Sequence, residues 1–202
     1  MNPPNALTLS RFGMALLLMV CLSISFCGNM IVALVIFILA ALTDALDGHL
    51  ARKIYGCTDF GKLMDPLADK VLTAAAFIGF VELGVMPAWM VTLILAREFM
   101  VTGLRLLAAD KGIVLAAGPW GKHKTIWQMI FISVVLLLGC IPYSETVSMA
   151  GIPIVTETAS CIDKFSTPIW WGALFVTFLS VFSGGHYFLD NKKLFKPIPS
   201  AE

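Results

Sequence analysis

Residues 44–69 read DALDGHLARKIYGCTDFGKLMDPLAD, and four aspartates of this stretch stand in two pairs inside an otherwise apolar chain. Asp44 and Asp47 are three positions apart, and Asp65 and Asp69 are four positions apart. If both halves are helical, the two members of each pair share a face of their helix. Carboxylates gathered in a low-dielectric setting repel one another and would bind protons unless cations lie between them. The spacing therefore predicts a metal site formed by these four aspartates.

The chemistry of the ligands narrows the choice of metal. Oxygen ligands alone, without Cys or His in the set, favour Mg²⁺ or Mn²⁺ over Zn²⁺. Gly48, Ala51 and Gly61 have little or no side chain, which leaves room for a bound molecule beside the metal.

The same residues form a recognisable pattern. The spacing D-x2-D-G-x2-A-R-x8-G-x3-D-x3-D resembles the signature of the CDP-alcohol phosphatidyltransferases, and all eight defining positions match. They are Asp44, Asp47, Gly48, Ala51, Arg52, Gly61, Asp65 and Asp69. The resemblance implies a membrane enzyme that binds CDP-diacylglycerol with its diphosphate on two divalent cations.

Further roles follow from the resemblance, residue by residue. It implies that Asp44, Asp47 and Asp65 are metal ligands. Asp69 would be a ligand or the general base that takes the proton from the acceptor hydroxyl. Gly48, Ala51 and Gly61 would make room for the nucleotide, and Arg52 and Thr58 would contact it. The hydroxyl would then attack the phosphorus that bears the diacylglycerol, and CMP would leave.

The sequences around the motif address the acceptor. Along most of residues 5 to 130 they resemble the phosphatidylglycerophosphate synthases of this family, which implies sn-glycerol 3-phosphate as acceptor and phosphatidylglycerophosphate as product. Arg97, Arg105, Lys122 and Lys124 could form a cationic pocket for the acceptor's phosphate. Two alternatives stay open. One is a cardiolipin synthase of the same superfamily with phosphatidylglycerol as acceptor, and the other is a carrier whose carboxylates line an ion path.

Composition places the chain in a membrane. Of its 202 residues, 58% are hydrophobic and 13% charged, and the mean hydropathy is +0.88. Such a chain lacks the polar residues to cover a soluble domain, so we expect one membrane domain over residues 1–202. The net charge of +1 suggests no nucleic-acid partner. The five cysteines lack the spacing of a zinc site.

Apolar runs predict an all-α bundle of six transmembrane helices. We place them near residues 7–27, 30–54, 60–84, 87–112, 125–141 and 168–189. A cleaved signal peptide is the alternative for the first run. Residues 143–167 form the least apolar stretch, where we expect a short loop outside the membrane with a hairpin or a brief helix, and whose role stays open.

Three charged residues of the fourth span can be interpreted in two ways. Glu98, Thr102 and Arg105 can share a helix face, whereas Arg97 should point elsewhere because it is adjacent to Glu98. Charges at this depth are usually functional, and the alternative is an ion pair between helices. Lys122 and Lys124, near the start of the fifth span, indicate either a nearby anion or ordinary anchoring at the membrane interface.

The orientation follows from the basic residues. Ten Lys and Arg lie in the N-terminal segment, the 52–62 turn, the 111–124 loop and the tail, against Lys164 alone on the other side. The positive-inside rule then places both termini and the carboxylate motif in the cytoplasm. We expect a protein of a bacterial inner membrane, in contact with membrane lipids, with Trp89, Trp170 and Trp171 at the outer interface. The resemblance also allows a homodimer.

Overall fold

The structure is a computed structural model that describes the backbone of residues 3–24, 28–54, 59–110, 119–149, 152–160, 162 and 165–191. Within these ranges it describes the side chains of residues 9–24, 28–43, 70–109, 121–141, 162 and 165–191.

Six long helices make up most of the described chain. They are α1 (Pro3–Ser23), α2 (Asn29–Ile54), α3 (Asp59–Glu82), α4 (Ala88–Asp110), α5 (Pro119–Gly139) and α7 (Ser166–Asp190). Each corresponds to one predicted span. The largest difference is in α5, which begins at Pro119, inside the predicted 111–124 loop. Proline suits the first position of a helix because its fixed φ is helical and its missing N–H would have no partner there.

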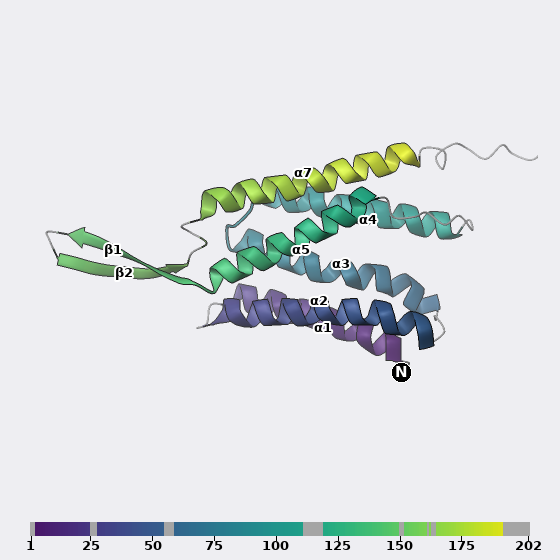
Figure 1. The fold of residues 1–202 in the computed structure, drawn as a ribbon, viewed down its shortest axis with the longest axis horizontal. Helices are drawn as coiled ribbons and strands as arrows, with labels where there is room; N and C mark the ends of the chain where they lie inside the picture. The colour runs from purple at the N-terminus through teal and green to yellow at the C-terminus, as the bar shows by residue number, and fades with distance from the viewer. Residues whose placement is uncertain are drawn as a thin grey trace, which may run out of the picture.

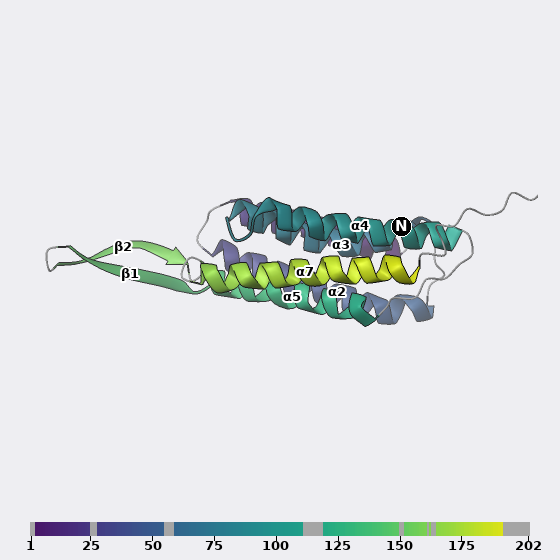
Figure 2. The ribbon, with the colours of Figure 1, turned by 90° about the horizontal axis from the view of Figure 1, so that it is seen from above.

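The helices run alternately up and down in one bundle (Figures 1 and 2), and their contacts form a closed ring. Around the ring the order is α1, α3, α4, α7, α5 and α2, and α3 also meets α5 across the middle. The start of α1 and the end of α7 lie at the same end of the bundle, as expected for an even number of helices that alternate in direction (Figure 1). The end of α2, the start of α3, the end of α4 and the start of α5 lie at this end too.

The core of the bundle is apolar and aromatic. Phe77 and Phe80 of α3 pack against Phe131 of α5, with ring centroids 6.3 to 6.4 Å apart. Gly79 faces α1 so closely that an added Cβ would lie 3.0 Å from the Cβ of Leu22. Small residues at such crossings let helix backbones approach, which is how helices associate in membranes.

Two glycines beside helix ends have positive φ angles. Gly28, with a φ of 85°, precedes α2, and the Asn29 side chain donates to the Ile24 carbonyl at 3.3 Å. Gly84, with a φ of 70°, follows α3, and the Val85 N–H donates to the Phe80 carbonyl at 2.9 Å. Both φ values lie in the left-handed region, where glycine carries no Cβ penalty.

The predicted all-α class is incomplete, because residues 142–160 contain a β-hairpin. Strands β1 (Pro142–Met149) and β2 (Ile152–Ser160) pair antiparallel, with Pro142 opposite Ser160 and an irregularity between Ser144 and Glu145. Prolines within the segment disfavour helix, and its Thr and Val residues favour strand. The hairpin projects from the end of the bundle opposite the two terminal ends (Figure 1). The hairpin expected as one possibility for this stretch is therefore present in residues 142–160.

The outside of the bundle is apolar. Large hydrophobic side chains are exposed along every described helix, among them Leu17, Leu39, Phe99 and Phe178. Trp89, Trp170 and Trp171 are exposed at the starts of α4 and α7, which is the hairpin end. By length and composition, one helix of the described residues, Ser166–Asp190, could cross a membrane, and Leu9–Ser23 and Asn29–Thr43 are shorter apolar helices. An apolar exterior of this extent indicates a membrane protein.

Candidate functional site

The carboxylate motif lies on the two helices that the sequence predicted. Asp44 and Asp47 belong to the helical backbone of α2, and Asp65 and Asp69 to that of α3. Because the backbone is helical at both pairs, spacings of three and four residues place each pair on one side of its helix. The side chains of residues 44–69 lie outside the described residues, so their convergence on a metal stays a prediction. The predicted nucleotide contacts of Gly48, Ala51, Arg52 and Gly61 also stay predictions. Thr58 lies outside the described backbone as well.

The donor set on these two helices nevertheless fits divalent cations. Four carboxylates on the last turns of one helix and the first turns of the next supply the oxygen ligands that Mg²⁺ and Mn²⁺ prefer. Elsewhere in the part of the chain whose side chains the structure describes, no three His, Cys, Asp or Glu residues come together.

A cavity of about 210 Å³ lies directly beside the motif. Ala41 in its wall is three residues before Asp44, and Lys70 in its wall follows Asp69. Five helices contribute to the wall. The lining residues are Arg11, Ala40, Ala41, Lys70, Leu72, Thr73, Glu98, Lys124, Thr125, Gln128 and Met129. A molecule bound at the motif could therefore extend into this cavity.

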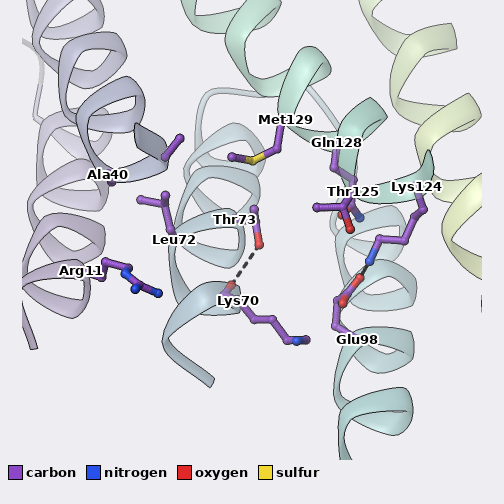
Figure 3. Close-up of a pocket in the computed structure, with 11 residues that line it drawn as sticks. Arg11, Ala40, Lys70, Leu72, Thr73, Glu98, Lys124, Thr125, Gln128 and Met129 are labelled. Atoms are coloured by element: carbon purple, nitrogen blue, oxygen red, sulfur yellow. Dashed lines mark hydrogen bonds and ion pairs between the residues drawn. The ribbon is translucent and has the colours of Figure 1, made fainter. Parts of the chain in front are cut away.

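Among the residues whose side chains are described, the cavity wall holds three basic side chains and one carboxylate. Arg11 of α1, Lys70 of α3 and Lys124 of α5 face one carboxylate, that of Glu98 on α4. Figure 3 shows Lys124 and Glu98 pointing toward one another, with the Lys70 side chain extending toward Glu98 in this view and Arg11 on the far side of the space. Basic side chains in the wall of a cavity can contact an anionic ligand.

The pair between Lys124 and Glu98 is buried. Lys124 is 3% exposed and Glu98 8% exposed, and the Lys124 ammonium contacts Oε1 of Glu98. Nη1 of Arg97 lies 3.5 Å from the same oxygen. One carboxylate therefore balances two buried cations, which makes Glu98 the central charge of the site.

Gln128 supplies a hydrogen-bond donor to the wall. Its side chain is 3% exposed, and its Nε2 has no hydrogen-bond partner among the described residues. Buried polar groups without a partner are uncommon because the loss of solvation costs about 1 to 3 kcal/mol. The amide is therefore placed to donate to a ligand in the cavity.

The four residues predicted for an acceptor phosphate do not share one position. Lys124 lines the cavity, and Arg97 reaches it indirectly through Glu98. Arg105 is exposed, and its Nε donates to the Tyr187 hydroxyl of α7 at 3.2 Å. Lys122 is exposed near the start of α5.

The prediction that Arg97 and Glu98 point apart is wrong. Their long side chains bend toward each other and meet, although the residues are adjacent on the helix. The interhelical ion pair that was the alternative for this span is present, between Glu98 and Lys124.

Three residues of the cavity escaped the sequence-based site prediction, namely Arg11, Lys70 and Gln128. Arg11 gave a weak signal, because it is a lone charge before 32 uncharged residues, 12–43. Lys70 gave another, because it directly follows Asp69. Both could have been assigned to the site only with knowledge of which helices adjoin α5.

Comparison with known proteins agrees with the motif. Residues 1–179 match the family model described as CDP-alcohol phosphatidyltransferase. A Bacillus subtilis protein named CDP-diacylglycerol--glycerol-3-phosphate 3-phosphatidyltransferase is 39% identical over 96% of this chain and 97% of its own length. A Rickettsia bellii protein of the same name is 32% identical over 96% of this chain and 97% of its own. A Mycoplasma pneumoniae protein of that name is 42% identical over 54% of this chain and 47% of its own. The chain, an enzyme of phospholipid biosynthesis, thus belongs to the CDP-alcohol phosphatidyltransferase family.

Proposed function

We propose that this protein transfers the phosphatidyl group of CDP-diacylglycerol to sn-glycerol 3-phosphate, forming phosphatidylglycerophosphate and CMP. Relatives that align along almost the whole chain are named for this reaction. The observation that carries the choice of acceptor is the cavity beside the motif, whose described wall holds the buried ammonium of Lys124 and the buried amide donor of Gln128. Such a wall suits the phosphate of glycerol 3-phosphate.

The carboxylates of α2 and α3 have two tasks in this proposal. Asp44, Asp47, Asp65 and Asp69 hold two Mg²⁺ or Mn²⁺ ions, which when bound neutralise the diphosphate and the charge that develops on the leaving CMP. Asp69 also takes the proton of the acceptor hydroxyl as general base. Gly48, Ala51 and Gly61 leave room for the cytidine, and Arg52 and Thr58 contact it.

The cavity orients the acceptor. Lys124 and Lys70 attract its phosphate, and the Gln128 amide donates to it, so that the hydroxyl at the other end of this small molecule is directed toward the motif. Lys70 directly follows Asp69, which keeps the phosphate end and the base close together. Positioning of this kind is the main contribution that a protein makes to phosphoryl-type transfer.

A neighbouring groove suits the lipid half of the donor. It has a volume of about 170 Å³ between α1, α3 and α4, and its apolar wall includes Ala15, Met19, Ala74 and Phe99. Lys70 lines both this groove and the polar cavity. An acyl chain in the groove would therefore leave its headgroup at the polar site.

The proposal includes a placement in the membrane. All six helices cross the bilayer of a bacterial inner membrane, with the motif, the cavity and both termini on the cytoplasmic side. The count of basic residues supports this side, as does the common location of these segments at one end of the bundle. A homodimer stays a prediction from the resemblance.

One assay separates the candidate functions. Protein purified in detergent receives CDP-diacylglycerol, Mg²⁺ and labelled glycerol 3-phosphate. Labelled lipid together with CMP supports the proposal. Product that forms only with phosphatidylglycerol indicates a cardiolipin synthase instead, and ion flux into vesicles without turnover indicates a carrier.

A further inference from the structure

Helix α7 packs closely against Arg97 of α4 at Gly184. A Cβ added to Gly184 would lie 2.6 Å from Cγ of Arg97 and 3.3 Å from its Nε. A Cβ added to the next residue, Gly185, would meet nothing within 4 Å. Of this pair of glycines, Gly184 alone leaves space for the stem of Arg97.

The Arg97 guanidinium beside Gly184 contacts a polar group on α7 and another on α4. Nη2 of Arg97 donates to Oγ of Ser183 at 2.9 Å, and that hydroxyl donates in turn to the Ser180 carbonyl at 3.0 Å. Nη1 lies 3.5 Å from Oε1 of Glu98. Arg97 and Ser183 are both buried, so water does not replace these contacts easily.

These contacts continue to the cavity. Oε1 of Glu98 also receives the Lys124 ammonium, so one carboxylate oxygen is shared between Arg97 and Lys124. A carboxylate shared between two cations neutralises each cation less than a carboxylate that contacts only one. With Arg97 in place, part of the negative charge of Glu98 is balanced by Arg97, so Lys124 exerts a stronger net attraction on a second anion in the cavity.

We propose that Ser183 and Gly184 of α7 are positioning residues that hold Arg97 against Glu98 and thereby set the affinity of Lys124 for the acceptor's phosphate. Helix α7 lies outside the signature motif and contributes no residue to the cavity wall. Its influence passes from α7 through α4 to α5. This inference rests on the proposed function, because it assumes that the acceptor's phosphate binds at Lys124.

The adjacent glycines give a matched test. Gly184→Ala displaces the Arg97 stem, whereas Gly185→Ala adds the same methyl group to open space one residue away. Initial rates are measured with each substrate varied in turn, and thermal unfolding is followed in detergent. We expect Gly184→Ala to raise the KM for glycerol 3-phosphate about tenfold, a change that corresponds to the loss of one charged contact. Its kcat and its KM for CDP-diacylglycerol should stay within about twofold, and Gly185→Ala should match the wild type.

A second pair of variants applies if Gly184→Ala fails to fold. Ser183→Ala removes only the hydroxyl that accepts from Arg97. Ser180→Ala removes a buried hydroxyl of the same helix that has no partner among the described residues. We expect the KM for glycerol 3-phosphate to rise in Ser183→Ala and not in Ser180→Ala.

Two results would overturn the inference. One is an unchanged KM for glycerol 3-phosphate in Gly184→Ala and Ser183→Ala, and the other is an equal loss for both substrates together with a lower unfolding temperature, which indicates a structural role. In either case the wild type still makes labelled phosphatidylglycerophosphate, so the proposed function stands. A wild type that makes none contradicts the proposed function itself.

Discussion

The charge of the site depends on single residues, and Glu98 matters most because its carboxylate contacts both Arg97 and Lys124. Its carboxylate is buried between Arg97 and Lys124 in a bundle with an apolar exterior. Removing one member of a buried ion pair leaves the other uncompensated, which costs about 3 to 5 kcal/mol. Glu98 therefore both stabilises the bundle and tunes the cavity.

Lys124 should affect the acceptor more than the donor. We expect Lys124→Gln to raise the KM for glycerol 3-phosphate about 10- to 100-fold, because it removes the most buried cation of the wall. The KM for CDP-diacylglycerol should change by no more than about threefold. His123→Gln, which alters the exposed neighbouring residue, is the control and should behave as the wild type. Equal effects on both substrates would show that Lys124 serves the Glu98 ion pair alone.

Substitution of Asp69 should lower the turnover rate more than it weakens the binding of CDP-diacylglycerol. Asp69→Asn keeps the size of the side chain but removes the base, so turnover should fall by about 100-fold or more. Liponucleotide binding, measured with labelled CDP-diacylglycerol and Mg²⁺, should remain within about tenfold. Asp59→Asn, at the first residue of α3 and outside the two pairs, is the control. Near-normal turnover in Asp69→Asn would exclude Asp69 as the base.

The sequence predicts the helices that carry the motif better than it predicts the cavity, for a physical reason. The aspartates Asp44 to Asp69 lie on two consecutive helices, so the local helical period relates their positions. Arg11, Glu98 and Gln128 come from three different helices, and only long-range packing brings them together. The adjacent Arg97 and Glu98 show a further limit, because backbone period does not determine where long flexible side chains end.

At the scale of the elements, helix contacts depend on residues without side chains. Gly79 lets α3 approach Leu22 of α1, as Gly184 lets α7 approach Arg97 of α4. In a membrane such contacts rely on close packing, since the lipid is as apolar as the helix surface.

Gly79→Ala should weaken the contact between α1 and α3. The new Cβ would lie 2.5 Å from Cδ1 and 3.0 Å from Cβ of Leu22. We expect a loss of about 1 to 3 kcal/mol, seen as a lower unfolding temperature in detergent. Gly103→Ala on α4 is the matched control, because its Cβ meets nothing within 4 Å and alanine favours helix.

A double variant checks the cause of the Gly79→Ala effect. Leu22→Ala makes room for the added methyl, so the double variant should be more stable than the sum of the two single effects implies. Strict additivity would contradict the contact between these two residues as the source of the loss.

The elements themselves were predictable where composition is extreme. Apolar runs gave the six helices, since each run is long enough and is interrupted by Gly, Pro or charged residues. The start of α5 at Pro119 was missed because glycines and lysines around it indicate a loop, while the proline that opens the helix is a subtler signal. The hairpin 142–160 stayed ambiguous because it is short and mixes prolines with β-branched residues.

At the scale of the whole molecule, the arrangement of the helices divides the chain between two ends. The motif, the cavity and the start of α5 belong to one end, and the hairpin belongs to the other (Figure 1). A substrate that is partly lipid and partly nucleotide reaches such a site from the membrane surface. Among the residues whose side chains are described, Arg11, Lys70, Lys122 and Lys124 belong to this end, which also favours the approach of anionic substrates.

Labelling of single cysteines tests this division. In a variant whose five native cysteines are replaced by alanine and whose activity is retained, Ser148→Cys places a thiol on β1, and His123→Cys places one near the start of α5. Because the two positions belong to opposite ends of the bundle, a maleimide that does not cross membranes should label Ser148→Cys in intact spheroplasts and His123→Cys only after permeabilisation. The reverse pattern would put the motif and the cavity outside the cell, away from cytoplasmic glycerol 3-phosphate, and would contradict the proposed orientation. Labelling of both thiols in intact spheroplasts would mean that the helices between them do not separate two compartments, and a membrane-spanning bundle would then be the wrong description of this fold.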